Sequence, residues 1–424
     1  MQMEIQHQID ETAAAGGGTV KFPPGIVLLS NALRLRSKVR LVGSAGTVLR
    51  RIPSVASRLV DRVGYGHYEF TVEDPDLFPV GSGVHVYDDL AWGFYTTVAT
   101  VIGRRGDLIF IDRPFAHDYG PGANGTVVRI SSIVDGTDIH DAALLDIELD
   151  GNTDETRLLD GCRGAGIFLL RAHRILIDNV NIGHFHGDGI SFQACTDVVI
   201  RDSNLHHNSG IGVHPGSGSV RYVIANNHVH DNGSHGIFYC LRSSHSDCRA
   251  NRIERNGDSG ISVGERDTHH LIRDNTIVEN GSAGIEFRTF VRRGGDFVRT
   301  EGNTIGPNCM TKGDCELMIA KGHYHLHFAR NHLSHAIGKK IVQIEAGCDA
   351  IHFVENSVAG APMTAADMIT TGSEVSFANP REPLAVGPAA LDPDGARHLN
   401  VESLPSWSPP LETRKRKNEA SSRG

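Results

Sequence analysis

The sequence lacks the cysteine pattern of a disulfide-stabilised domain. Its 7 cysteines are an odd number scattered over 424 residues, and no CxxC spacing indicates a metal site. Cys309 and Cys315 are near enough in sequence to pair, but buried free thiols are the expectation.

Long apolar runs are also missing. No segment approaches the roughly 20 apolar residues that a membrane-spanning helix needs, so we expect no membrane span. The first residues, MQMEIQHQID, have no apolar core of a signal peptide. Either the protein stays inside the cell or a leader has been removed; a secreted or periplasmic location is expected from the function class alone.

Excess positive charge is absent as well. The formal net charge is -9, and the last segment, ETRKRKNEASSRG, carries five basic and two acidic side chains, so that the rest of the chain carries -12. A nucleic-acid-binding protein would present a basic face. We therefore expect no nucleic-acid partner.

Helical periodicity and a leucine-rich template are both missing from the middle of the chain. A Gly-Ile or Gly-Val pair recurs there about once in every two dozen residues. The pairs begin at Gly166, Gly189, Gly212, Gly236, Gly260 and Gly284. Between them lie short β segments such as YVIANNHVHDN and GIFYC, separated by Asn, Gly and Ser turns. This period predicts a solenoid with one coil per repeat, a right-handed parallel β-helix.

Asparagine keeps the same period. Asn227, Asn251 and Asn275 are separated by one repeat each, and the series continues at Asn303, Asn331 and Asn356. We expect these residues to adopt the left-handed conformation of a turn and to hydrogen-bond to their copies in adjacent coils. Their recurrence needs no functional explanation.

The repeat divides the chain into five segments. Residues 1–57 are expected to form an N-terminal cap, with a short helix in EIQHQIDETAA, and the first β-helix strands. Residues 58–128 break the period and are typical of a small inserted antiparallel β domain. The main β-helix is predicted for 129–360, followed by a C-terminal arm (361–411) and a basic tail (412–424). The predicted fold is all-β, a right-handed parallel β-helix with a small inserted antiparallel β domain.

The motif GGGTVKFPPG near the start, the GDGI and GI-type coils and the period resemble the pectate-lyase-like superfamily of right-handed β-helix proteins. The resemblance covers roughly residues 15–360. It implies a fold shared by polysaccharide lyases, glycoside hydrolases, uronan epimerases, tailspikes and adhesins. The complete polygalacturonase set (Asn-Thr-Asp, Asp-Asp, Gly-His-Gly, Arg-Ile-Lys) does not occur, and neither does the Asp-Pro-His motif of alginate epimerases, so the fold alone does not decide the chemistry.

Alternation along each repeated strand predicts which side chains face outward. The column that begins at Ile167 and the column two residues later are expected to fill the core. The residues between them are expected to face solvent: Phe168, Ser191, His214, Phe238, Ser262 and Glu286. In the copy GIGVHPGSGS, Pro215 still fills a core position while His214 is presented outward. A strand that gives up packing in this way is typical of a functional site.

His, Arg and carboxylate side chains therefore gather on one predicted face, as acid–base chemistry on a polysaccharide requires. The candidate catalytic residues are His214, Arg242, Glu265 and Glu286. The candidate substrate-binding residues are Gln193, His235, Phe238, Arg266, Asp267, Arg288 and Asp188. A polysaccharide or oligosaccharide is the expected partner.

Structural roles compete with these assignments. Glu286 and Arg288 also suit an exposed ion-pair ladder, and Asp188 in HGDGI suits a turn cap. Six turn histidines are more typical of hydrogen bonding than of catalysis, and their spacing indicates no metal site. They are His184, His186, His206, His207, His228 and His230. No cofactor is required, although calcium held by Glu265, Asp267 or Asp188 is an alternative.

Three function classes stay open. A lyase or related C5-acting enzyme on a uronate polymer would use His214, or else His235, as the base, with Arg242 or Arg288 stabilising the developing enolate. A glycoside hydrolase would use two carboxylates among Glu265, Asp267, Glu286 and Asp188. A non-catalytic glycan-binding or structural β-helix would need none of these groups.

Overall fold

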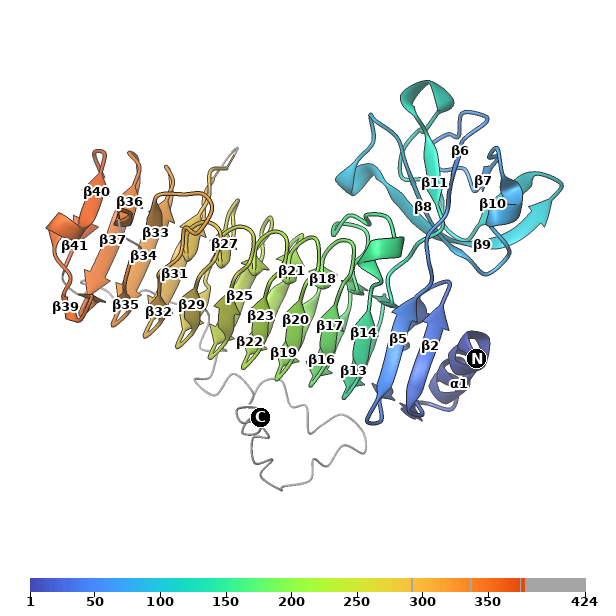
Figure 1. Ribbon diagram of the computed structural model, residues 1–424, viewed down its shortest axis with the longest axis horizontal. Helices are drawn as coiled ribbons and strands as arrows, with labels where there is room; N and C mark the ends of the chain where they lie inside the picture. The colour runs from blue at the N-terminus through green and yellow to red at the C-terminus, as the bar shows by residue number, and fades with distance from the viewer. Residues whose placement is uncertain (291–292, 336–337, 374, 378–424) are drawn as a thin grey trace, which may run out of the picture.

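The computed structural model describes residues 1–290, 293–335, 338–373 and 375–377, which form a long β-helix with a smaller domain beside its N-terminal end (Figure 1). Each coil contributes one strand to each of three sheets of 12, 12 and 11 strands, which we call sheets 1, 2 and 3 after their first strands. The predicted all-β fold, a right-handed parallel β-helix with a small antiparallel β domain, is confirmed.

The strands of sheet 1 are β1 (Gly18–Lys21), β4 (Val39–Val42), β13 (His140–Leu145), β16 (His173–Asp178), β19 (Thr196–Arg201), β22 (Val220–Ala225), β25 (Ser244–Arg249), β28 (Leu271–Arg273), β31 (Asp296–Glu301), β34 (Tyr324–Ala329), β37 (Asp349–Val354) and β41 (Val375–Ser376). The strands of sheet 2 are β2 (Gly25–Leu29), β5 (Thr47–Arg51), β14 (Glu148–Asp150), β17 (Asn181–Gly183), β20 (Asn204–His206), β23 (His228–His230), β26 (Arg252–Glu254), β29 (Thr276–Val278), β32 (Thr304–Ile305), β35 (His332–Leu333), β38 (Ser357–Val358) and β39 (Ala361–Pro362). All neighbours are parallel except the last pair of sheet 2.

Sheet 3 carries the candidate site. Its strands are β3 (Leu33–Arg34), β12 (Val134–Thr137), β15 (Ile167–Leu170), β18 (Ile190–Gln193), β21 (Val213–Gly216), β24 (Ile237–Phe238), β27 (Ile261–Val263), β30 (Ile285–Phe287), β33 (Cys315–Ile319), β36 (Lys340–Ile344) and β40 (Met368–Thr370). Both β40 and β41 pair with the coil before them, so the sheets continue beyond residue 360. The rest of the predicted arm and the whole tail, 378–424, lie outside the described residues.

The core lies between the three sheets. Ile167, Ile190 and Val213 are 0% exposed and stack in register from β15 to β21, which confirms the predicted inward column. The helix α1 (Gln2–Ala14) closes the N-terminal end by burying Ile5 and Ile9 against the first coil. Burial of continuous apolar columns stabilises each coil at roughly 25 cal/mol per Å² of apolar surface.

The asparagine series forms a buried ladder, as expected. Asn251 Nδ2 donates to the Ile224 carbonyl at 2.8 Å and to Asn275 Oδ1 at 2.9 Å, and the pattern repeats from coil to coil. The expected left-handed conformation is wrong for these asparagines, because the preceding residue takes it instead, as at Ala250 and Asp274. A second ladder, which we did not predict, runs through Asn208, Asn232, Asn256, Asn280 and Asn308.

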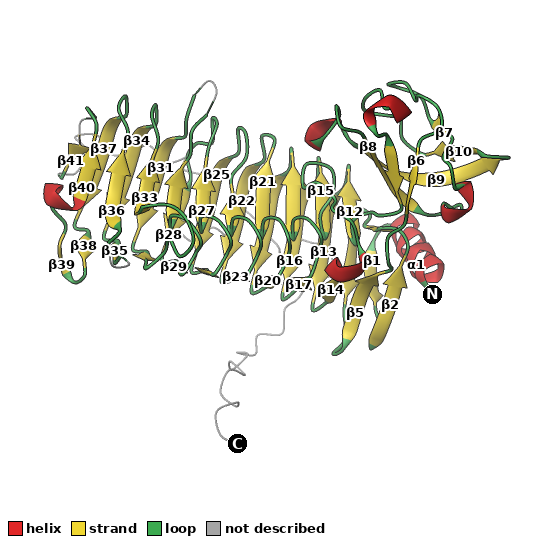
Figure 2. Cartoon of the chain, turned by 45° about the horizontal axis from the view of Figure 1, so that its top comes forward, coloured by secondary structure: helices red, strands yellow, loops and turns green. Residues whose placement is uncertain are grey.

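The smaller domain lies between β5 and β12 in the chain and projects from one side of the β-helix (Figure 2). Its sheet contains β6 (Ala56–Arg58), β7 (Glu69–Phe70), β8 (Gly83–Tyr87), β9 (Thr97–Arg105), β10 (Leu108–Ile111) and β11 (Thr126–Val128). Short 3-10 helices are η1 (Pro75–Leu77), η2 (Gly93–Tyr95) and η3 (Pro121–Ala123) here, and η4 (Thr153–Glu155) and η5 (Ala365–Asp367) elsewhere. The domain has a core of its own, separate from that of the β-helix.

The seven cysteines all lie within the described residues and are free. Cys309 and Cys315 are each 4% exposed, in agreement with the expectation of buried thiols. Within the same part of the chain, no helix has both the length and the apolar character required to cross a membrane.

A candidate site on sheet 3

Strand β21 places His214 on the outer side of sheet 3, yet the side chain is not open to solvent. His214 is 4% exposed and its neighbour Ser191 is 0% exposed. A loop, residues 157–166, lies over this part of the sheet, and Ser191 Oγ donates a hydrogen bond of 2.6 Å to the Gly161 carbonyl. The expectation of a solvent-facing column is therefore wrong for Phe168, Ser191, His214 and Ser262, which are at most 4% exposed, because alternation shows the side of a strand but not what covers it.

Asp188 is the partner of His214. Its Oδ2 lies 2.7 Å from His214 Nδ1, and its Oδ1 accepts a hydrogen bond of 2.9 Å from the Ile211 backbone. Asp188 is 5% exposed, so it forms a buried charge-assisted contact in addition to bonding the turn. A Cβ added to Gly161 would lie 1.7 Å from Asp188 Oδ2. The covering loop can therefore approach the pair only with glycine at this position.

The electrostatics of His214 favour the charged ring. Burial lowers the pKa of His214, but the hydrogen bond with Asp188 and the neighbouring Cys240 thiol outweigh this effect and raise the pKa to about 10. Nε2 is buried and has no hydrogen-bond partner among the described residues. At neutral pH the ring is a buried imidazolium beside the Cys240 thiol, which suits a charge stabiliser better than a base.

Phe238 organises a second group beside this pair. Its ring packs edge-on against His214, with a centroid distance of 5.6 Å, and stacks on His235 at 4.9 Å. The Arg288 guanidinium carbon lies 3.8 Å from the Phe238 centroid, and Arg288 donates to Ser262 Oγ at 3.1 Å. Phe238 thus holds two imidazoles and a guanidinium together while its side chain stays partly exposed.

His235 has the opposite electrostatic character to His214. Burial lowers the pKa of His235 to about 4, although Asp258, 3.9 Å away, opposes the shift. Its Nδ1 is buried and has no hydrogen-bond partner in the described part of the chain, whereas the side chain as a whole is 13% exposed. At neutral pH His235 is therefore uncharged and retains a lone pair that can accept a proton.

Asp267 is committed to the backbone around it. It is 0% exposed and accepts hydrogen bonds from the Ser243 backbone at 2.9 Å, the Ser243 hydroxyl at 3.1 Å and the Gly264 backbone at 2.9 Å. Burial raises the pKa of Asp267 to about 6, against the opposing effect of Arg288, which lies 3.7 Å away. Asp267 thus holds the turn after β27 and the guanidinium of Arg288.

Glu286 lies apart from the histidines. Its Oε2 accepts hydrogen bonds from Ser259 Oγ at 3.1 Å and Ser262 Oγ at 3.2 Å. Strands β24 and β27 lie between β21 and β30, so that Glu286 is roughly 14 Å from His214 at the usual strand spacing. The two side chains cannot share a proton.

The remaining candidates lie at the rim or in the floor. Arg242 is exposed in the turn after β24, and its backbone N–H donates to the Glu265 carbonyl at 3.0 Å. Glu265 forms an ion pair with Arg266 at 3.2 Å. Gln193 is 3% exposed and donates to Ser191 Oγ at 2.9 Å.

The carboxylates considered for calcium have separate partners. Glu265 pairs with Arg266, Asp267 accepts from Ser243, and Asp188 binds His214. The metal-ligand groups found among the described residues do not include these three carboxylates. The structure therefore gives a calcium site at these residues no support.

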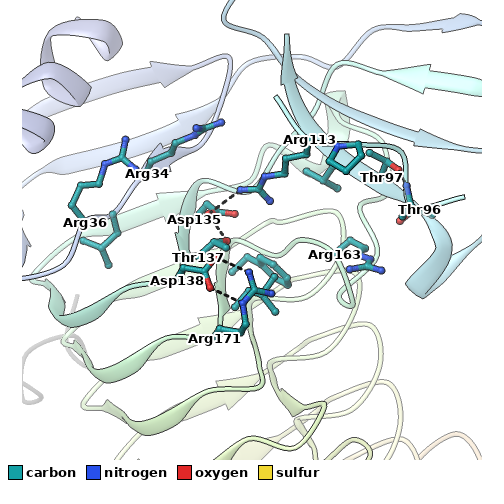
Figure 3. Close-up of a pocket in the computed structure, with 16 residues that line it drawn as sticks. Arg34, Arg36, Thr96, Thr97, Arg113, Asp135, Thr137, Asp138, Arg163 and Arg171 are labelled. Atoms are coloured by element: carbon teal, nitrogen blue, oxygen red, sulfur yellow. Dashed lines mark hydrogen bonds and ion pairs between the residues drawn. The ribbon is translucent and has the colours of Figure 1, made fainter. Parts of the chain in front are cut away.

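A cavity of about 610 Å³ opens between the smaller domain and the N-terminal part of sheet 3 (Figure 3). Its polar lining includes Arg34, Arg36, Arg113, Arg163, Arg171, Thr96, Thr97, Thr137, Asp135 and Asp138. Arg171 is neutralised by two contacts with Asp138, at 2.5 and 2.6 Å. Arg113 lies 3.8 Å from Asp135, and Arg163 donates to the Phe94 carbonyl at 2.9 Å. Arg113 and Arg163 are therefore the cations with most capacity left for an anion.

The spacing of Asp188 and His214 in the sequence could have predicted that they form a pair. His214 follows Asp188 by one coil plus three positions, and Cys240 follows His214 by one coil plus two positions. That spacing places the residues on one side of adjacent coils. The arginine cavity has no such signal, because its side chains come from separate segments that meet only when the smaller domain docks on the β-helix.

Comparisons with known proteins agree with this architecture. The family described as "Right handed beta helix region" matches residues 119–247 and 157–292. No curated protein matches the chain in sequence.

Three solved structures illustrate the likeness. The A-module of Azotobacter vinelandii mannuronan C-5 epimerase AlgE6 is 18% identical, with a TM-score of 0.51, over 90% of this chain and 96% of that one. The AlgE4 A-module from the same organism is 16% identical, with a TM-score of 0.53, over 88% and 95%. The Dettilon tailspike protein is 11% identical, with a TM-score of 0.52, over 88% of this chain and 64% of the tailspike.

At these identities the likeness concerns the fold. The family match, the three-sheet architecture and the structural neighbours together identify the chain as a right-handed parallel β-helix protein with the fold of the pectate-lyase-like superfamily.

Proposed function

We propose that sheet 3 carries a carbohydrate-active site that acts at C5 of a uronate in an acidic polysaccharide, by β-elimination or by epimerisation. The observation that carries the proposal is the pair of unlike histidines against Phe238. His214 is held by Asp188 at 2.7 Å, whereas Nδ1 of His235 has no hydrogen-bond partner among the described residues.

Chemistry at C5 needs a base for the proton and a positive charge for the enolate that develops on the C6 carboxylate. Unlike environments divide these two tasks between neighbouring titratable groups. His235 takes the proton, because burial keeps its pKa at about 4 and its ring neutral. Arg288, 19% exposed, contacts the carboxylate. His214 adds a fixed positive charge below the outer surface of sheet 3. This division makes His235 the base, in place of His214.

The arginine cavity extends the site toward an anionic chain. It lies on the same sheet, at β12 and β15, two to three strands from His214. At the usual strand spacing this is roughly 10–14 Å, the span of a short oligosaccharide. Cations along a groove attract an anionic substrate even where the whole chain is negatively charged.

The names of two structural neighbours support C5 chemistry in particular. Both epimerase modules are mannuronan C-5 epimerases with TM-scores above 0.5. A glycoside hydrolase is less favoured, because it needs two cooperating carboxylates. Asp267 and Glu286 are each engaged by serine hydroxyls instead.

The test is incubation with a panel of polymannuronate, polyguluronate, polygalacturonate and neutral glucans. Elimination is followed by the ultraviolet absorbance of unsaturated uronates and by reducing ends, and epimerisation by proton NMR of the uronate residues. The variants are His235→Ala and Asp188→Asn, with His332→Ala, an exposed histidine of sheet 2, as the matched control. We expect activity on a uronate polymer that both site variants lose and the control keeps. Cleavage of neutral glucans, or full activity in His235→Ala, would contradict the proposal.

A further inference from the structure

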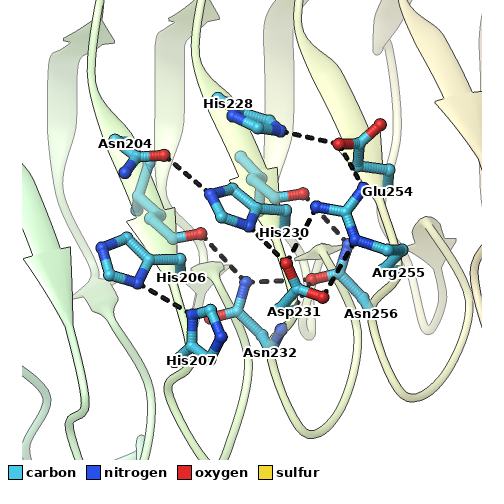
Figure 4. Close-up of polar contacts among 12 residues, drawn as sticks. Asn204, His206, His207, His228, His230, Asp231, Asn232, Glu254, Arg255 and Asn256 are labelled. Carbon is cyan, nitrogen blue, oxygen red and sulfur yellow. Dashed lines mark hydrogen bonds and ion pairs between the residues drawn. The ribbon is translucent and has the colours of Figure 1, made fainter. Parts of the chain in front are cut away.

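A cluster of histidines lies on sheet 2, in strands β20 and β23 and in the turns that follow them (Figure 4). Strand pairing places His206 beside His230, so that His207 and Asp231, the next residues, occupy equivalent turn positions on adjacent coils. Both have left-handed backbones, with φ of 51° and 52°. One ligand atom each from His207, His230 and Asp231 lies within 4.8 Å of the others.

Asparagines fix the tautomer of His230. Asn204 Nδ2 donates to Asn181 Oδ1 at 2.8 Å, which leaves Asn204 Oδ1 to accept from His230 Nε2 at 2.9 Å. In a neutral His230 ring, the lone pair is then on Nδ1. That atom lies 2.6 Å from Asp231 Oδ2. Two electron-rich atoms at this distance require a proton or a metal ion that both can bind.

The same logic applies to the imidazole pair on the preceding coil. Asn181 Oδ1 also accepts from His206 Nε2 at 3.1 Å, so that the lone pair of a neutral His206 is on Nδ1. His207 Nδ1 lies 3.0 Å away and donates its hydrogen to that lone pair. Nε2 of His207 is then left with a free lone pair on an exposed side chain. The asparagines act as the outer partners that orient metal-binding imidazoles.

The carboxylate is also held in place. Arg255 donates to Asp231 Oδ1 from Nε at 3.0 Å and to Oδ2 from Nη2 at 2.9 Å. Glu254 pairs with the same guanidinium and offsets its charge. Metal–ligand bonds of about 2.0–2.2 Å put ligand atoms roughly 3–4 Å apart. The ion therefore replaces the proton between His230 and Asp231 and moves their ligand atoms slightly apart, while rotation of the exposed His207 side chain brings a ring nitrogen to the ion.

We propose that His207, His230 and Asp231 bind one transition-metal dication of the Zn²⁺ type. Two imidazoles and one carboxylate suit Zn²⁺ and its neighbours, whereas Ca²⁺ and Mg²⁺ prefer oxygen ligands alone. The ion joins the turns of two adjacent coils, and water completes its coordination. His230 also lines a groove of about 670 Å³ on sheet 2, which gives the ion a path from solvent. The site is independent of the proposed catalytic function.

The test is calorimetric titration of the full chain, without a polyhistidine tag and after chelator treatment, with Zn²⁺ and separately with Ca²⁺. The variants are His207→Ala, His230→Ala and the nearly isosteric Asp231→Asn. The matched control is His332→Ala, which removes a histidine of the same sheet far along the β-helix. Circular dichroism establishes that each variant is folded.

We expect one Zn²⁺ per chain, a loss of affinity of at least about tenfold in each of the three site variants, and no change in His332→Ala. Zn²⁺ should also raise the thermal midpoint of the wild type and not that of His230→Ala. Absence of Zn²⁺ binding, an equal loss in His332→Ala, or tighter binding of Ca²⁺ than of Zn²⁺ would overturn the proposal.

Discussion

The exchange Asp188→Asn tests the electrostatic origin of the His214 charge. Asparagine keeps the shape of the side chain but removes the carboxylate that lies 2.7 Å from Nδ1. The ring stays buried, and burial lowers the pKa of a histidine. We therefore expect the pKa of His214 to fall from about 10 to below its ordinary value of 6.5.

The magnitude follows from linkage. A pKa raised from 6.5 to about 10 corresponds to roughly 5 kcal/mol, at 1.36 kcal/mol per unit. Loss of one partner of a buried ion pair costs about 3–5 kcal/mol, in the same range. Because the pKa is higher in the folded state, this stability is fully present below pH 6.5 and is lost as the pH rises through the folded pKa.

The assay combines two measurements between pH 6 and pH 10. Nitrogen-15 NMR of the imidazole reports the titration of His214, and denaturant unfolding reports the free energy of unfolding. We expect the deficit of Asp188→Asn to be largest near pH 6 and to shrink toward pH 10. A deficit that is constant over this range, or a wild-type His214 that titrates near 6.5, would show that Asp188 does not hold the charge of His214.

Three further predictions concern the surrounding structure. Gly161→Ala should destabilise the protein by about 1–3 kcal/mol in denaturant unfolding, because the new Cβ meets Asp188. The control Gly122→Ala should have no such effect, since nothing lies within 4 Å of its new Cβ. Equal effects of the two exchanges would contradict the close approach of the loop. Asn251→Ala should cost about 3 kcal/mol or more, because it leaves several buried ladder groups unpaired, and a cost below about 1 kcal/mol in the same assay would argue against the ladder. Burial lowers the pKa of His85 to about 3, so this histidine lowers the free energy of unfolding as the pH falls below 6.5. Between pH 6.5 and pH 4.5, the free energy of unfolding of His85→Leu should therefore fall by about 2–3 kcal/mol less than that of the wild type. An equal fall in both proteins would contradict this prediction.

The fold could be predicted because the repeat is a local pattern with a direct physical cause. Each coil repeats its Ile or Val at one phase, and Ile190 and Val213 are 0% exposed as that pattern requires. Alternation also gave the correct side of the strand for His214. It could not reveal that the loop 157–166 buries this residue, since covering loops have no fixed phase in the repeat.

The site was predicted less completely, because charge and burial depend on contacts between coils and domains. Asp188 suits a turn cap in sequence, and only the distance of 2.7 Å to His214 makes it an ion-pair partner. Likewise, His235 and His214 look alike in sequence, whereas their environments shift their pKa values in opposite directions. Periodic spacing predicts which face a side chain lies on. It does not predict how deeply that side chain is buried, and burial and partners set the pKa that distinguishes a base from a charge stabiliser.

The most direct test of the account is exchange of the C5 hydrogen of a uronate polymer in heavy water. Both elimination and epimerisation begin with removal of this proton, so one measurement by NMR and mass spectrometry covers both outcomes. We expect deuterium at C5, or an unsaturated uronate, with the wild type and with His332→Ala, and neither with His235→Ala. Cleavage or modification of the polymer without any change at C5, or unchanged exchange in His235→Ala, would contradict it.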